Sequence, residues 1–132
     1  MALDVSLFLA TKAAPVKETT YVVSDRFVDN DGKSIAWVLK PVNSVKEKEI
    51  KQNCIKGNTF DRVSYIEQLT AETVADPNLA DATLQDSYKA YGKTALLESM
   101  LTSGELNKLE VKALEVNGLN TPIDQLVDEA KN

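Results

Sequence analysis

The sequence contains no histidine, and this absence removes most catalytic templates. Without an imidazole there is no Ser-His or Cys-His nucleophile pair, no histidine-ligated metal and no general base that titrates near neutral pH. Carboxylate pairs could still act as acid and base, but here the acidic residues stand at expected helix caps and exposed helix positions. The sequence therefore predicts a binding protein with no cofactor, metal or catalytic residue.

Cysteine is almost absent as well, since Cys54 is the only one. The chain can form no internal disulfide and no cysteine-rich metal site, which favours a reducing compartment. Cys54 itself is expected to be a small buried hydrophobe.

Long hydrophobic runs are also missing. Leu7, Phe8 and Leu9 form an apolar stretch that is too short to cross a bilayer, and Asp4 stands where a signal peptide needs positive charge. We expect a short helix or arm over residues 1–16, within a single domain that spans residues 1–132.

The net charge of −5 is unevenly distributed. Residues 1–60 carry nine Lys and Arg against seven Asp and Glu, whereas residues 61–132 carry six against thirteen. An acidic surface of this kind repels nucleic acid and anionic membranes, so neither is an expected partner.

Residues 17–43 show the alternation of a β-hairpin. Two runs of alternating apolar and polar residues, 19–27 and 35–39, flank the turn sequence Asp29-Asn30-Asp31-Gly32. One face of each run is apolar, formed by Tyr21, Val23 and Phe27 and by Ile35, Trp37 and Leu39. This aromatic face needs a helix to cover it, so we expect an α+β fold with the hairpin packed on a mainly helical domain.

Residues 44–132 read as several short helices. Ser44 with Glu47 and Thr102 with Glu105 are capping-box signatures, while Asp61 and Asp81 suit N-caps. The expected helices cover residues 44–54, 62–75, 81–92, 94–101, 105–116 and 121–130, with Pro77, Gly92 and Asn117-Gly118 as stop signals.

Two motifs imitate ligand sites. Residues 87–94 end in Gly-Lys-Thr like a phosphate-binding loop, but Ser87 replaces the first glycine and no strand precedes it, so a helix that ends at Gly92 is favoured. Residues 29–32 resemble part of a calcium loop, but that register puts Phe27 and Val38 where carboxylates are required. A hairpin turn explains the same residues.

The densest apolar cluster lies between residues 84 and 101. Its members are Leu84, Tyr88, Tyr91, Leu96, Leu97, Met100 and Leu101. Most of such a cluster is expected to be core. The alternative is a groove for a partner helix, because Met and Tyr suit adaptable binding surfaces. These seven residues are the candidate partner-binding residues.

The same region resembles a known family. The run 76–88 contains Pro-x-Leu-x-Asp-x-x-Leu-Gln-Asp-Ser-Tyr, and it is followed by Leu96-Leu97-x-x-Met100-Leu101, by Gly104-Glu105 and by Asn117-Gly118. Together with the segment 21–27, the strand around Trp37 and the position of Cys54, this order is similar to that of the XkdN-like phage tail assembly chaperones. The resemblance covers nearly the whole chain.

The resemblance implies a phage or prophage protein that works in the cytoplasm of the bacterial host while a tail is built and is absent from the mature virion. Its implied partners are the tape measure protein, which it would keep soluble, and the tail tube protein, whose assembly it would promote. Homo-oligomers are possible, and many members also have a longer form made by ribosomal frameshifting. The alternative is a structural tail component, such as a tail completion or connector protein.

Overall fold

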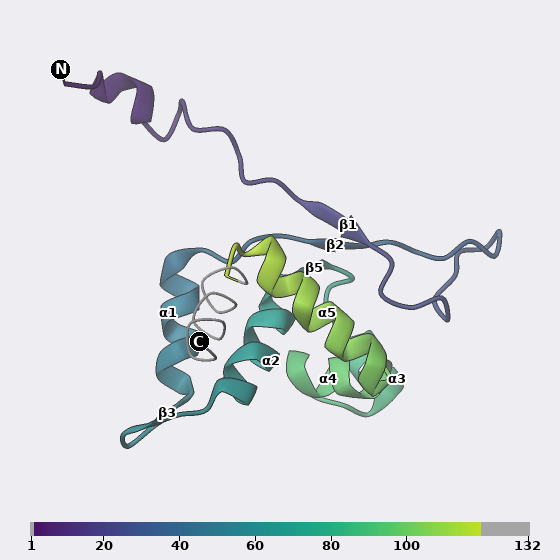
Figure 1. The fold of residues 1–132 in the computed structure, drawn as a ribbon. Helices are drawn as coiled ribbons and strands as arrows, with labels where there is room; N and C mark the ends of the chain where they lie inside the picture. Colours follow the sequence, from purple (N-terminus) through teal and green to yellow (C-terminus); the bar gives the residue numbers. More distant parts are fainter. Residues whose placement is uncertain (1, 120–132) are drawn as a thin grey trace, which may run out of the picture.

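The computed structural model describes residues 2–119 of the chain. It has an α+β fold, as the sequence predicts, with a small sheet lying across a group of helices (Figure 1). The elements are η1 (Val5–Phe8), β1 (Thr19–Tyr21), β2 (Trp37–Leu39), α1 (Ser44–Asn53), β3 (Ile55–Lys56), β4 (Thr59–Phe60), α2 (Arg62–Thr73), β5 (Val74–Asp76), α3 (Ala82–Tyr88), α4 (Lys93–Met100) and α5 (Ser103–Val116). The expected helix over residues 121–130 lies outside the described residues.

The predicted hairpin exists, but its ladder is shorter than the sequence pattern suggests. Strands β1 and β2 pair antiparallel only over three residues each, from Thr19 opposite Leu39 to Tyr21 opposite Trp37. Beyond the ladder, the Ser24 hydroxyl accepts a hydrogen bond from the Arg26 amide at 3.2 Å and bends the chain away from its partner.

The turn at the far end of the hairpin forms as predicted. The Asp29 carboxylate accepts hydrogen bonds from the amides of Asp31 and Lys33, and Gly32 takes a positive φ of 81°. The acidic side chain is therefore used by the turn itself.

The third strand corrects the sequence analysis. Val74 and Ala75 were expected to continue a helix, but α2 ends at Thr73 and β5 pairs with β2 to give the order β1-β2-β5. The residue before a proline disfavours helical geometry, and here Asp76 precedes Pro77. The Lys40 amide also donates to the Thr73 carbonyl at 2.9 Å, so sheet bonding begins where the helix stops.

The helix starts follow local signals. Asp61 and Asp81 accept hydrogen bonds from the amides three residues ahead, and Thr102 and Glu105 form a reciprocal capping box. The prediction for α1 was wrong by one residue, because the cap is Asn43, whose side chain accepts from the Lys46 amide.

Helix α3 is shorter than predicted. It ends at Tyr88, and Lys89 adopts the left-handed conformation that closes it, with φ of 52°. Gly92 does not end this helix; it is the N-cap residue of α4, which begins at Lys93 and not at Thr94. Tyr91 therefore lies in the connection between two helices.

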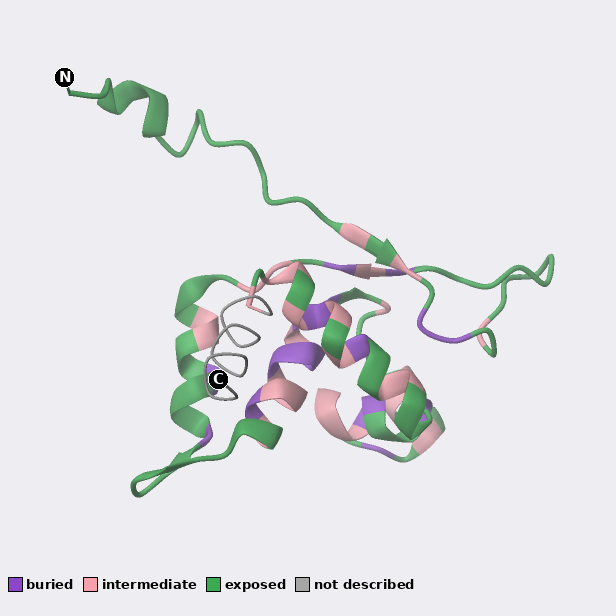
Figure 2. Ribbon diagram, viewed as in Figure 1, coloured by how far each residue is buried: buried purple, intermediate pink, exposed green. Residues whose placement is uncertain are grey.

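Two hydrophobic clusters stabilise the part of the chain formed by the sheet and the helices. Figure 2 colours the buried residues of these elements purple. Helix α2 is central and packs against α1, α4 and α5. The larger cluster joins the sheet to α4 and α5 and contains Val23, Trp37, Leu39, Ala71, Val74, Leu79, Leu96, Leu97, Met100, Leu101 and Leu109. The smaller one joins α1 to α2 through Ile50, Cys54, Tyr65 and Leu69.

Two valines on helices lie outside both clusters. Val45 on α1 and Val63 on α2 are 70% and 68% exposed. Cys54, in contrast, is buried as predicted. Within residues 2–119 no helix is both long enough and apolar enough to cross a bilayer.

Candidate protein-docking site

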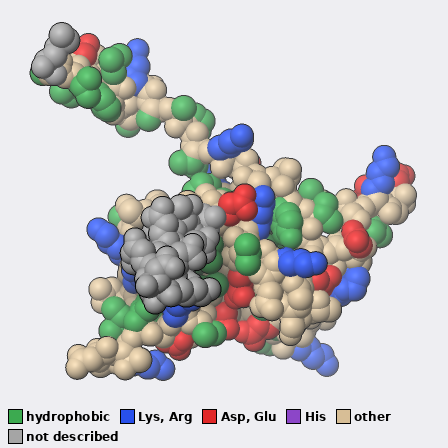
Figure 3. Space-filling view, in the orientation of Figure 1, with side chains coloured by type: hydrophobic (Ala, Val, Ile, Leu, Met, Phe, Trp, Pro, Cys, Tyr) green, Lys and Arg blue, Asp and Glu red, His purple; other side chains and the backbone are tan. Residues whose placement is uncertain are grey.

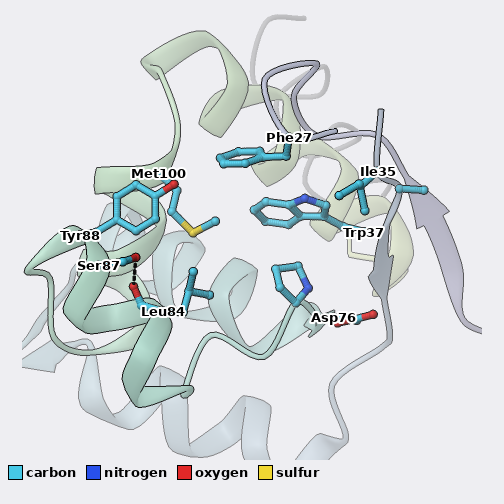
Figure 4. A pocket seen from close by; sticks show the side chains of 10 residues that line it. Phe27, Ile35, Trp37, Asp76, Leu84, Ser87, Tyr88 and Met100 are labelled. Atoms are coloured by element: carbon cyan, nitrogen blue, oxygen red, sulfur yellow. Dashed lines mark hydrogen bonds between the residues drawn. The ribbon is translucent and has the colours of Figure 1, made fainter. Parts of the chain in front are cut away.

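An apolar pocket opens between the hairpin and helices α3 and α4 (Figure 4). We name it the Trp37 pocket, and its volume is about 330 Å³. It is lined by Phe27, Ile35, Ala36, Trp37, Asp76, Pro77, Leu84, Ser87, Tyr88 and Met100. Most of these side chains are apolar, with Asp76 and Ser87 as the polar exceptions, so the pocket suits an apolar side chain or a short apolar segment.

The hairpin supplies the aromatic wall. Trp37 and Leu39 alternate on one face of β2, where they are 2% and 0% exposed. Phe27 comes from the bent segment after β1, and its ring centroid lies 6.2 Å from that of Trp37 at a tilt of 48°. Such a tilted arrangement is favourable for aromatic pairs and holds the wall in place.

Helices α3 and α4 supply the opposite wall. Leu84 and Tyr88 lie one turn apart on α3, and Met100 is the last residue of α4. Figure 4 shows their side chains directed toward the space in front of the Trp37 ring. The flexible thioether of Met100 can adapt to differently shaped occupants.

One hydrogen bond within α3 and one from α3 to the preceding segment involve side chains of this helix. The Ser87 hydroxyl donates to the Leu84 carbonyl at 2.7 Å. The side-chain amide of Gln85 donates to the backbone carbonyl of Leu79, a buried core residue, at 2.8 Å. The short helix is thus tied to the core through a side chain on its own surface.

Arg26 fastens the bent segment of the hairpin to the start of α5. Its guanidinium donates to the Met100 carbonyl and to the Glu105 carboxylate, both at 2.7 Å, and lies 5.3 Å from the Phe27 ring centroid. Hydrogen bonding with the Arg26 side chain, then with the Ser24 side chain and with the Thr102 amide, lowers the pKa of Glu105 to about 2. The ion pair therefore persists across the physiological pH range.

The seven candidate residues from the sequence fall into three groups. Leu84, Tyr88 and Met100 line the Trp37 pocket. Leu96, Leu97 and Leu101 are 0%, 1% and 7% exposed and belong to the larger cluster. Tyr91 is 67% exposed and is not among the residues that line the pocket.

The sequence reasoning missed the hairpin's contribution to the pocket. Phe27, Ile35 and Trp37 were assigned to an aromatic face that a helix covers, and Pro77 only to a helix stop. The sequence did contain a signal for this site. The hairpin face carries three large apolar side chains, and only short helices are available to cover it, so part of that face stays accessible.

Cys54 lies in the smaller cluster, away from this pocket. Desolvation by burial raises the pKa of its thiol, which disfavours the reactive thiolate. Among residues 2–119 the structure contains no group of three or more metal-ligating side chains.

Comparison with known proteins identifies the class. The chain belongs to the family of phage XkdN-like tail assembly chaperone proteins, which matches residues 5–131. This is a family of phage assembly proteins and not an enzyme class, and membership implies protein partners during tail assembly.

Two relatives from Bacillus subtilis (strain 168) resemble the chain over nearly its whole length. The phage-like element PBSX protein XkdN is 28% identical over 98% of this chain and 94% of its own. The uncharacterized protein YqbN is 26% identical over 98% of this chain and 93% of its own length. A crystal structure of the protein yqbn superposes with a TM-score of 0.81 at 23% identity, covering 89% of this chain and 98% of the other. That structural likeness supports the fold.

Proposed function

We propose that this protein is a chaperone for the tape measure protein, that it carries out no chemistry of its own, and that it holds apolar segments of its client in the Trp37 pocket. Family membership supplies the general role. The observation that carries the site is an apolar pocket whose floor is formed by the buried side chains of Trp37 and Met100 and whose rim includes the accessible Ile35.

In this proposal the client is a long helical chain with more apolar surface than it can bury alone, as the family resemblance implies. One pocket of about 330 Å³ covers only a short stretch of such a client. Many copies, each bound weakly, would shield it together and leave when tail tube subunits polymerise around it. The protein would act in the host cytoplasm and be absent from the finished particle, whereas a structural tail component would remain there in abundance.

Co-expression with the tape measure protein of the same phage or prophage tests the proposal. The wild-type chain should keep the client in the soluble fraction. Ile35→Asp and Ser87→Lys should abolish this rescue, since each places a charge at the rim of an apolar pocket. Ile35 is 43% exposed and Ser87 is exposed, so neither change should unfold the domain.

Val63→Asp is the matched control. Val63 is 68% exposed in the first turn of α2, where a carboxylate is compatible with the helix dipole. Full rescue by both pocket variants, with client solubility equal to that of the control, would show that the Trp37 pocket is not the client site.

A further inference from the structure

The N-terminal arm carries an apolar segment that is exposed in the described part of the chain, residues 2–119. Residues 2–18 are all exposed, and the tip of the arm gathers hydrophobic side chains (Figure 3). These are Leu3, Val5, Leu7, Phe8 and Leu9, with exposed fractions of 75%, 73%, 66%, 66% and 50%. A concentration of apolar surface like this one marks an interaction site.

The tip is a formed structure. Asp4 caps the short 3-10 helix η1, accepting from the amide and the hydroxyl of Ser6 at 3.0 and 2.8 Å. After it, the amides of Lys12 and Ala13 donate to the Leu9 carbonyl and close a turn. The arm thus presents its apolar side chains on a compact knob.

The register of the sheet directs the arm away from the Trp37 pocket of the same chain. Tyr21 pairs with Trp37 at the end of the ladder next to the pocket, whereas Thr19 pairs with Leu39 at the other end. The chain before Thr19 therefore leaves at the end far from the pocket. Figure 1 shows the arm extending away from the helices.

We propose that residues 3–9 of one copy dock in the Trp37 pocket of a second copy. The knob offers Phe8 and leucine side chains, and the pocket offers Trp37, Phe27 and Met100. The turn after the knob extends to Ala13, and residues 14–18 between this turn and the strand span up to about 17 Å when extended, which holds the knob away from its own sheet. A pocket of about 330 Å³ has room for one or two of these side chains, so docking would bury Phe8 or a neighbouring leucine against Phe27 and Ile35.

This inference rests on the proposed function, because it assigns a second occupant to the same pocket. The arm resembles the client in chemistry, as a short apolar segment with helical turns. This docking of the arm of one copy in the pocket of another, which we call arm exchange, would keep the chaperone's pockets filled before a client is present. A client segment would then compete with the arm for the pocket, so self-association and client binding oppose each other.

Sedimentation velocity of the full chain over a concentration series tests arm exchange. The wild-type chain should associate reversibly, and so should the control Val63→Asp. The arm variant Leu7→Ser/Phe8→Ser and the pocket variant Ile35→Asp should each associate at least about a hundredfold more weakly, because either side loses apolar burial. Leu7 and Phe8 are both 66% exposed, so the arm variant should remain folded.

Mixing the two variants distinguishes exchange from other association. The pocket variant still has an intact arm and the arm variant an intact pocket, so an equimolar mixture should form complexes that neither forms alone. A wild-type chain that stays monomeric, an arm variant that associates like wild type, or a mixture that stays monomeric would each overturn the inference.

The client assay separates this inference from the proposed function. If arm exchange fails while Ile35→Asp still abolishes client rescue, only the exchange is wrong. If exchange is observed while Ile35→Asp still rescues the client, the client site is wrong and the arm site stands.

Discussion

At the scale of single residues, Asn117 holds three parts of the chain together. Its side-chain carbonyl accepts from the Val42 amide at 2.8 Å. Its amide group donates to the Thr73 hydroxyl at 2.9 Å and to the Ala113 carbonyl at 2.7 Å. Thr73 is fully buried and donates in turn to the Leu69 carbonyl. One side chain thereby joins the segment after β2, the end of α2 and the end of α5.

Replacing Asn117 with Ala should lower the free energy of unfolding by about 1–3 kcal/mol, because the Val42 amide loses its acceptor and the Thr73 hydroxyl loses one of its two partners. Urea unfolding measures this difference. Asn107→Ala on the exposed face of α5 is the control and should change stability by less than about 0.5 kcal/mol. Equal losses in the two variants would contradict the structural role of Asn117.

At the scale of elements, the bent hairpin segment depends on its attachment to α5. The ion pair of Arg26 and Glu105 supports the Phe27 side of the pocket, while the capping box of Thr102 and Glu105 starts the helix. Glu105 thus serves two elements at once. Loss of the Glu105 charge should weaken both the attachment of the hairpin segment and the capping of α5.

The lowered pKa of Glu105 predicts a pH dependence. A carboxyl whose folded pKa of about 2 lies below its ordinary value of 4.5 stabilises the fold above pH 4.5 and loses this effect as the pH falls toward 2. Wild type should therefore be more stable than Glu105→Gln at pH 7, and the difference should shrink steadily below about pH 4.5. Urea unfolding of both proteins at several pH values measures it, and a difference that stays constant down to pH 2.5 would exclude the assigned ion pair.

Local signals predicted the helices better than the sheet. Asp61, Asp81 and the capping box act over three residues, so the sequence alone identifies them. Strand β5 could not be seen this way, since Val74 and Ala75 continue the periodicity of α2 and become a strand only by pairing with distant β2. Pairing at such a separation depends on the whole fold.

The site was predictable only in part for a related reason. Helical spacing selected Leu84, Tyr88 and Met100, which line the pocket, but it selected Leu96 and Leu97 equally well. Which apolar residue is covered depends on the element packed above it. That information lies in the tertiary arrangement of hairpin and helices, and spacing within one helix does not contain it.

At the scale of the whole molecule, the fold places the apolar knob of the arm far from the apolar Trp37 pocket. The knob of the arm and the Trp37 pocket lie toward opposite ends of the short ladder between β1 and β2. Under the two proposals made above, this arrangement would link copies of the chain to one another or place many copies, through their pockets, along one long client. The sequence carries a net charge of −5, which would keep such coated complexes apart by like-charge repulsion.

The central claim is that the Trp37 pocket holds the client, and site-specific photo-crosslinking during co-expression tests it most directly. A photoreactive amino acid at Ser87, on the exposed rim, should give a covalent adduct containing the tape measure protein, identified by its peptides. The same amino acid at Val63 on α2 should give none. An adduct of equal yield at position 63, or no adduct at position 87 while the client remains soluble, would contradict the account.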